Sequence, residues 1–221
     1  GQSNSTDYDV TGNHGSADYW IIKLDSNGEL LWQKSLGGNA NDYAYSIDET
    51  SDGGSIVTGT SYSSDGDVSI NYGSNDCWIV RLDSSGNIVW EKTFGSSGSQ
   101  SGDEIKQTTD GDFIVVGIQN VMYKVFKINS SGDLIWEQYY GGLSTDIPQS
   151  VAITSDDSFI VAGFSSSIDG DVTSNQGVFD YWILKVDSNG DLIWEKSLGG
   201  SGDDRAMSII ESNNQGVVIA G

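Results

Sequence analysis

The chain has 221 residues, a formal net charge of −22, 29 glycines, one proline and one cysteine. This length suits one large domain or two small ones, and the composition is typical of a turn-rich, all-β protein. The charge repels phosphate backbones and anionic membranes, so we expect no nucleic-acid partner. The sequence has no apolar run of roughly 18 residues, so we also expect no membrane insertion.

One motif occurs four times along the chain. Its copies run without gaps from a basic residue through a Ser-x-Gly turn to a tryptophan, and they begin at Lys23, Arg81, Lys127 and Lys185. A second marker, the glycine that ends an apolar run, recurs at Gly1, Gly59, Gly117, Gly163 and Gly221. Because internal repeats define the architecture, we divide the chain into four repeats. They cover approximately residues 1–58, 59–116, 117–162 and 163–221 of a single domain, 1–221.

Each repeat predicts four short strands, here called A to D in chain order. In the second repeat these are 43–50, 55–59, 77–83 and 87–93. Their near-continuous apolar runs are typical of strands covered on both faces. Period, strand count and turn spacing predict an all-β β-propeller with four four-stranded blades. An open β-solenoid is the alternative, but the tight hairpin turn in every repeat favours antiparallel blades.

The repeat pattern also makes a prediction about the two ends of the chain. The chain starts just after a strand B and stops at the end of another. We therefore expect the N-terminal C and D strands to pair with the C-terminal A and B strands, which closes the ring and removes sheet edges. The alternative is that these four repeats are a fragment of a larger propeller.

The repeats resemble those of a known group of proteins. The pattern from Asp18 through Trp32 to Asp52 resembles the repeats of bacterial secreted and cell-surface β-propellers of unassigned function. The piece from Leu24 to Trp32 is also similar to the quinoprotein-type propeller repeat. This resemblance implies an exported, extracellular module that is often part of a longer surface protein. The third copy departs from the pattern, with Lys124 at the position of Trp20.

Three loops between strands B and C suggest calcium. Each is twelve residues long, has oxygen-bearing side chains at positions 1, 3, 5, 7 and 12, and resembles the ligand spacing of an EF-hand without its glycine and glutamate. The third repeat lacks this unit, which therefore behaves as a removable module. The alternative is a set of Asx turns that bind no metal. The candidate ligands are Asp7, Asp9, Thr11, Asn13 and Asp18; Asp65, Asp67, Ser69, Asn71 and Asp76; and Asp169, Asp171, Thr173, Asn175 and Asp180.

Other reactive residues follow the repeat and so favour structural roles. Cys77 stands where other copies have tyrosine, which predicts a packing residue. His14 stands at a variable loop position, which predicts a surface residue. Asp42, Asp146 and Asp204 share one repeat position, which predicts hydrogen bonding at the start of strand A. An active site should break the repeat, and nothing outside it supplies a quinone site.

The sequence therefore predicts a non-catalytic extracellular binding or structural module, stabilised by calcium. We expect a surface glycan or a protein as its ligand, and a monomer or a part of a longer surface protein as its state. The alternative in another class is a glycan hydrolase or lyase that uses carboxylates on one face.

Overall fold

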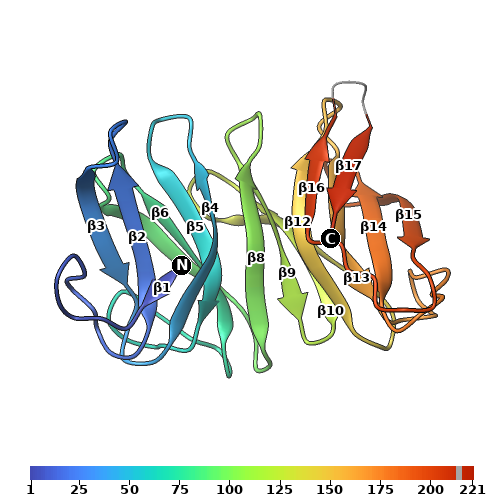
Figure 1. Cartoon of the computed structure of the whole chain (residues 1–221), viewed down its shortest axis with the longest axis horizontal. Helices are drawn as coiled ribbons and strands as arrows, with labels where there is room; N and C mark the ends of the chain where they lie inside the picture. Colours follow the sequence, from blue (N-terminus) through green and yellow to red (C-terminus); the bar gives the residue numbers. More distant parts are fainter. Residues whose placement is uncertain (213–215) are drawn as a thin grey trace. The chain divides into compact units, whose positions relative to one another are not determined.

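The computed structural model describes residues 1–212 and 216–221, which form strands β1 to β17 (Figure 1). None of the described residues belongs to a helix that could cross a membrane. The chain divides into two compact units, Gly1–Gly102 and Asp103–Gly221.

The first unit contains two antiparallel sheets whose neighbouring strands are consecutive in sequence. One sheet has the order β1-β2-β3, and the other has the order β4-β5-β6-β7. The bounds are β1 (Gln2–Ser3), β2 (Asp18–Leu24), β3 (Leu30–Leu36), β4 (Asp42–Glu49), β5 (Ser55–Ser61), β6 (Asp76–Leu82) and β7 (Ile88–Phe94).

The second unit contains three sheets. Two are four-stranded, with orders β11-β10-β9-β8 and β12-β13-β14-β15, and the third is the pair β16-β17. Strand β8 begins at the end of the first unit. The bounds are β8 (Gln100–Gln107), β9 (Phe113–Gln119), β10 (Met122–Ile128), β11 (Leu134–Tyr140), β12 (Asp146–Ile153), β13 (Phe159–Ser165), β14 (Asp180–Val186), β15 (Leu192–Leu198), β16 (Ser208–Glu211) and β17 (Val217–Ala220).

The turn between strands C and D is built the same way in each repeat. Between β6 and β7, the Asp83 carboxylate accepts hydrogen bonds from the backbone N–H groups of Ser85 (2.8 Å) and Asn87 (2.9 Å). Gly86 has a φ of 79°, which is the left-handed conformation that glycine adopts without strain. The Asp-Ser-x-Gly motif is thus a hairpin turn, which supports our interpretation of these segments as turn chemistry.

Each unit has a core in which a tyrosine joins neighbouring repeats. The Tyr19 hydroxyl donates to the Trp78 carbonyl oxygen at 3.1 Å, and the Tyr123 hydroxyl donates to the Trp182 carbonyl oxygen at 3.1 Å. Both tryptophans are fully buried. Cys77 is also fully buried, as expected of a packing residue.

The prediction of four blades in a closed ring is wrong in two respects. The described residues form five sheets, and β17 pairs with β16 alone, so the terminal strands do not share a blade. Strand β2 pairs with β3 and, through Tyr19 and Asp18, with the two residues of β1. The part of the β2 edge nearest its start is therefore already taken by the residues that precede it in the chain.

Candidate functional site

The three predicted calcium loops, here called the acidic loops, are 7–18, 65–76 and 169–180. Two of them clamp the loops that lead into strands β4 and β12, here called the return loops (37–41 and 141–145). In the first unit, Asp65 accepts a hydrogen bond from the Asn39 N–H (2.8 Å) and Asp67 accepts one from the Gly37 N–H (3.2 Å). The carboxylates at positions 1 and 3 therefore bind backbone donors from another segment.

The second unit repeats this clamp. Asp169 accepts a hydrogen bond from the Leu143 N–H at 2.9 Å, and Asp171 accepts one from the Gly141 N–H at 3.1 Å. In the first acidic loop, the equivalent residues Asp7 and Asp9 are exposed. Ser69, at position 5 of the second loop, is exposed as well. The same residue types at the same spacing thus give the same clamp in the second and third acidic loops.

Positions 5, 7 and 12 also have partners close at hand. The asparagine at position 7 donates from Nδ2 to the last residue of strand B, and the aspartate at position 12 accepts from the N–H of position 8. The position-7 residues are Asn13, Asn71 and Asn175, and the position-12 residues are Asp18, Asp76 and Asp180. At position 5, the Thr11 hydroxyl accepts a hydrogen bond from Gln33 of β3, and the Thr173 hydroxyl donates one to Glu195 of β15. The asparagine Oδ1 at position 7 also accepts from the N–H two residues on, which is an Asx turn.

The fit of calcium to these loops is partial. Among residues 1–212 and 216–221, no group of three or more His, Cys, Asp or Glu side chains is arranged to hold a metal ion. However, the second carboxylate oxygen of the position-12 aspartate is buried without a hydrogen-bond partner in the first and third loops, at Asp18 and Asp180. Buried polar atoms are normally satisfied. Calcium binding stays a prediction.

A second carboxylate lies beside the first of these aspartates. Asp42 is fully buried and accepts hydrogen bonds from Ser61 Oγ (2.5 Å), Ser63 Oγ (2.8 Å) and the Gly38 N–H (2.8 Å). Asp146 has the same three kinds of partner in the second unit. These contacts agree with the predicted role at the start of strand A. Burial first, and the charge of Asp42 in addition, raise the pKa of Asp18.

Sequence reasoning missed the role of His14 at this junction. Its Nδ1 lies 3.0 Å from an Asp18 oxygen and 3.8 Å from an Asp67 oxygen, so it bridges two acidic loops. The equivalent residues Tyr72 and Gln176 gave no hint of this contact, because it exists only where the first and second acidic loops meet.

The raised pKa of Asp18 predicts a pH effect that one substitution should remove. The folded state holds the Asp18 proton more tightly than the unfolded state. The stability that it contributes is therefore present below the unfolded pKa of about 3.9 and is lost as pH rises through the raised folded pKa. We expect Asp18→Asn to raise the free energy of unfolding at pH 7 by about 1 kcal/mol, because it replaces a buried negative charge near Asp42 with a neutral amide.

Urea unfolding at pH 7 and at pH 3 measures this effect. The gain should disappear at pH 3, where Asp18 is protonated. The same comparison in a His14→Gln background, which copies Gln176 of the fourth repeat, separates the contribution of His14. Equal stabilisation at both pH values would contradict the titration of Asp18.

Two exposed apolar side chains break the repeat pattern on the second unit. Leu143 is 89% exposed and Ile168 is 78% exposed. The clamp residue Asp169, which follows Ile168, binds the Leu143 N–H, so the two residues are held side by side. We call Leu143 and Ile168 the apolar patch. The matching residues of the first unit, Asn39 and Ser64, are polar. Comparison of the repeats could therefore have identified the apolar patch from the sequence.

Tyr8 is a second departure from the repeat. It is 94% exposed and has a φ of 54°, whereas its equivalents Gly66 and Gly170 have a φ of 65°. A bulky residue in this conformation costs roughly 1–2 kcal/mol relative to glycine. Strain of this kind concentrates at functional sites.

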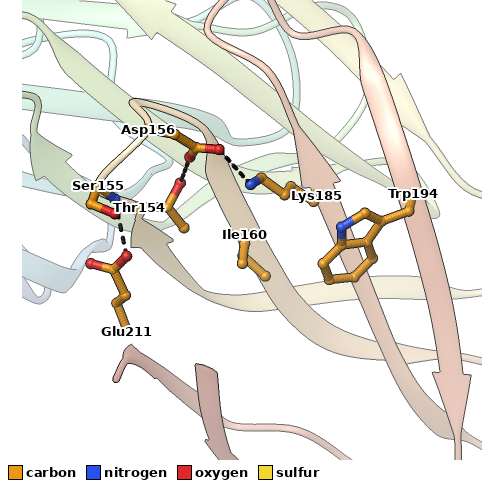
Figure 2. A pocket seen from close by; sticks show the side chains of 7 residues that line it. All are labelled: Thr154, Ser155, Asp156, Ile160, Lys185, Trp194 and Glu211. Carbon is orange, nitrogen blue, oxygen red and sulfur yellow. Dashed lines mark hydrogen bonds and ion pairs between the residues drawn. The ribbon is translucent and has the colours of Figure 1, made fainter. Parts of the chain in front are cut away.

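The second unit also has a polar pocket of about 300 Å³ (Figure 2). Lys185 Nζ lies 2.8 Å from Asp156 Oδ2, and Glu211 accepts a hydrogen bond from the Ser155 N–H at 3.0 Å. The bond from Lys185, and then that from Thr154, hold the pKa of Asp156 well below its usual range. The Lys–Asp pair is repeated as Lys127–Asp110, at 2.6 Å, so it belongs to the scaffold. Ile160 and Trp194 form the apolar part of the pocket lining.

The fold is that of β-propeller proteins with repeated four-stranded blades. A protein of unknown function from Bacteroides caccae matches 95% of this chain with a TM-score of 0.60 and 13% identity. The Neurospora crassa Pan2 WD40 domain matches 96% with a TM-score of 0.59 and 10% identity, and the Dos1 propeller matches 90% with a TM-score of 0.54 and 13% identity.

At these identities the likeness concerns the fold alone. The chain spans 63%, 57% and 46% of the lengths of these three proteins, respectively. No protein-family model matches the sequence, and no curated protein matches it.

Proposed function

We propose that this protein is a non-catalytic extracellular binding module whose protein or glycan ligand contacts the loop end of the second unit. The apolar patch supports this proposal most strongly. Leu143 and Ile168 project into solvent from loops that Asp169 and Asp171 hold in place. Exposed apolar side chains on a rigid support mark binding surfaces. The export of the protein is inferred from the resemblance of its repeats to those of secreted propellers.

The pKa values and the burial of the carboxyl groups favour a binding module over a glycan hydrolase or lyase. A general acid in a glycosidase needs both a raised pKa and access to the substrate. Burial raises the pKa of Asp18 and of Asp146, but both side chains are fully enclosed. The solvent-facing Asp52 and Asp110 have a pKa of about 2, because of hydrogen bonds from Thr50 and Lys127, respectively. Asp52 and Asp110 are thus poor proton donors.

A binding screen with a matched control tests the role of the apolar patch. We expect wild-type protein to bind a subset of probes on a glycan array or among immobilised surface proteins. The double variant Leu143→Asn/Ile168→Ser copies the residues of the first unit, so it should fold normally and lose at least about tenfold in affinity. The control Asn39→Ala/Ser64→Ala alters the matching place in the first unit and should keep full binding.

Two results would overturn this proposal. One is unchanged binding by the Leu143→Asn/Ile168→Ser variant. The other is turnover of a glycan substrate that a single Asp→Asn change abolishes, which would establish the enzyme alternative.

Calcium stabilisation is a separate part of the proposal. We expect the melting temperature to rise in millimolar calcium and to fall with chelator, because an ion that binds only the folded state stabilises it by mass action. The partnerless oxygens of Asp18 and Asp180 support a cation at position 12. Asp180→Asn should reduce the shift.

The outcome against calcium is equally clear. A melting temperature that does not respond to calcium would leave the acidic loops as Asx turns satisfied by backbone donors. Magnesium at the same concentration controls for general screening of a chain with net charge −22.

A further inference from the structure

Arg205 occupies a variable position of the repeat in the second unit. It follows Asp204, the aspartate that begins strand A in three repeats, and precedes a residue that is small or proline in every repeat. Its equivalents are Tyr43, Ser101 and Ile147. Tyr43 and Ile147 are partly exposed although a strand B pairs with each of them, so this position reaches solvent in complete sheets as well. A position that varies between constant neighbours and reaches solvent is suited to contact a ligand.

The guanidinium group of Arg205 lies against two phenylalanine rings. Its Cζ atom is 4.7 Å from the ring centroid of Phe164 and 4.5 Å from that of Phe179. The two rings meet edge to face, with an angle of 83° between their planes. Phe164 is buried in β13, and Phe179 is partly exposed just before β14. Because a guanidinium stacks on aromatic rings, these contacts hold Arg205 in one orientation before any ligand arrives.

All three side chains of this cluster depart from the repeat. Arg205 is the one arginine at its position, and no other repeat has an aromatic residue at the position of Phe164 or of Phe179. The residues that stand there instead are Thr60 and Ile118 for the first, and Ala17 and Asn75 for the second. A functional site should break the repeat, and here three exceptions in the fourth repeat meet at one place.

Asp203 uses only part of the hydrogen-bonding capacity of Arg205. Its Oδ1 accepts from Nε at 2.8 Å, and its Oδ2 accepts from Nη2 at 3.1 Å. A guanidinium carries five N–H groups, so about three remain, two on Nη1 and one on Nη2. Among the residues that the structure describes, none accepts a hydrogen bond from this second edge of the guanidinium. Two parallel N–H groups of this kind fit both oxygens of one carboxylate.

An exposed aliphatic side chain lies beside this arginine. The Val178 N–H donates to the Gly202 carbonyl oxygen at 2.9 Å, which ties the third acidic loop to the loop 199–203 that leads to Arg205. Val178 is 61% exposed. The equivalents of Val178 in the other acidic loops are the polar Ser16 and Ser74. The free edge of the guanidinium thus has an apolar neighbour that the other repeats lack.

We propose that the second unit binds a protein partner through a carboxylate, which accepts hydrogen bonds from Nη1 and Nη2 of Arg205 while aliphatic side chains of the partner contact Val178. The carboxylate belongs either to an Asp or Glu side chain or to the C-terminus of the partner. This inference rests on the proposed binding function and deepens it, because it names the chemistry of the ligand.

The composition of the loops favours a protein over a glycan. Loops 141–145, 166–179 and 199–204 contain no tyrosine or tryptophan that could stack on a sugar ring. Their exposed apolar side chains are the aliphatic Leu143, Ile168 and Val178, which gain most from contact with other apolar side chains. Arginine is enriched at protein interfaces and among their hot spots. The same loops contain no lysine or arginine, and the chain has a net charge of −22, so a single carboxylate fits better than a polyanion.

An array of paired peptides tests the carboxylate. Each probe is a short peptide of Leu, Ile, Val, Ser and Gly with one central glutamate, and its twin has glutamine there. A second set of pairs differs only in a free or an amidated C-terminus. We expect wild-type protein to bind a subset of the charged probes and to bind their uncharged twins at least about tenfold more weakly. The set that shows the difference identifies the source of the carboxylate.

Substitutions connect this selectivity to Arg205. Arg205→Gln should abolish the preference for charged probes, and Arg205→Lys should restore only part of it, because an ammonium group does not bind both carboxylate oxygens in one plane. Lys196→Gln removes an exposed cation from β15 and is the matched control, which should keep the preference. Circular dichroism establishes that each variant is folded.

Asp203→Asn gives a result that a purely structural ion pair does not predict. It removes the carboxylate that competes for Arg205. The affinity for charged probes should therefore rise by roughly two- to fivefold, the range of an exposed ion pair. The affinity for the uncharged twins should stay the same.

Three outcomes would overturn the role of Arg205. The first is equal binding of charged and uncharged twins by wild-type protein. The second is a preference that survives Arg205→Gln. The third is an affinity that does not rise in Asp203→Asn, which would mean that the guanidinium is committed to Asp203.

The failure of this inference is distinguishable from that of the proposed function. If no peptide binds, but a glycan binds and is lost in the Leu143→Asn/Ile168→Ser variant, the carboxylate site is wrong and the binding function stands. If the peptide preference depends on Arg205 but that double variant changes no binding, the arginine site stands and the role of the apolar patch is wrong.

Discussion

Replacing Trp78 by alanine should lower the free energy of unfolding by about 3–5 kcal/mol, the usual cost of deleting a fully buried aromatic side chain. Trp78 has no exposed area, and its ring centroid lies 4.8 Å from that of Tyr19. Its Nε1 donates to Glu91 at 2.7 Å. The substitution thus creates a cavity at the contact between two repeats and removes the partner of a carboxylate.

Trp20 provides a matched control for this substitution. It occupies the same repeat position and makes the same kind of bond, from Nε1 to Gln33 at 3.0 Å, but it lies in the partly covered strand β2. Trp20→Ala should therefore cost clearly less than Trp78→Ala in urea unfolding. Equal costs would mean that β2 is as fully covered in solution as β6.

Replacing Gly59 by alanine should be nearly as damaging, at about 3 kcal/mol. A Cβ on Gly59 would lie 2.7 Å from the Tyr19 hydroxyl and 2.9 Å from the Ala44 Cα, and it would also clash with the Tyr43 carbonyl oxygen. Because two of these three atoms are backbone, no side-chain rotation relieves the overlap. Strand β5 would have to move away from β4 and from the Tyr19 hydroxyl, which disturbs the hydrogen bond from that tyrosine to Trp78.

Gly202→Ala controls for the loss of backbone freedom alone. No heavy atom beyond its chain neighbours lies within 4 Å of the Cβ position of Gly202. In urea unfolding, the free energy of unfolding of the variant should therefore stay within about 0.5 kcal/mol of the wild-type value. If Gly59→Ala behaved like Gly202→Ala, the close packing of Tyr19 against β5 would be incorrect. Near-ultraviolet circular dichroism would report the loss of the tyrosine–tryptophan contact directly.

The sequence showed which side chains of the acidic loops carry oxygen atoms, but it did not show which groups bind them. The spacing of Asp65 and Asp67 marked a repeated oxygen-rich unit. The donors that these carboxylates bind, the N–H groups of Asn39 and Gly37, lie 26 and 30 residues earlier in the chain. No periodic pattern specifies such contacts, because a backbone N–H has no sequence signature.

The sequence by itself determined the repeat, the four-strand unit and its turns. These features are local, since a turn such as Asp83 to Asn87 is satisfied by its own carboxylate and glycine. Only the tertiary structure decided which repeats are covered. Ile22 and Val80 occupy the same position of the same motif, yet one is 42% exposed and the other fully buried. The difference lies in the neighbouring strand B, which β5 provides in full to β6 and β1 provides only in part to β2.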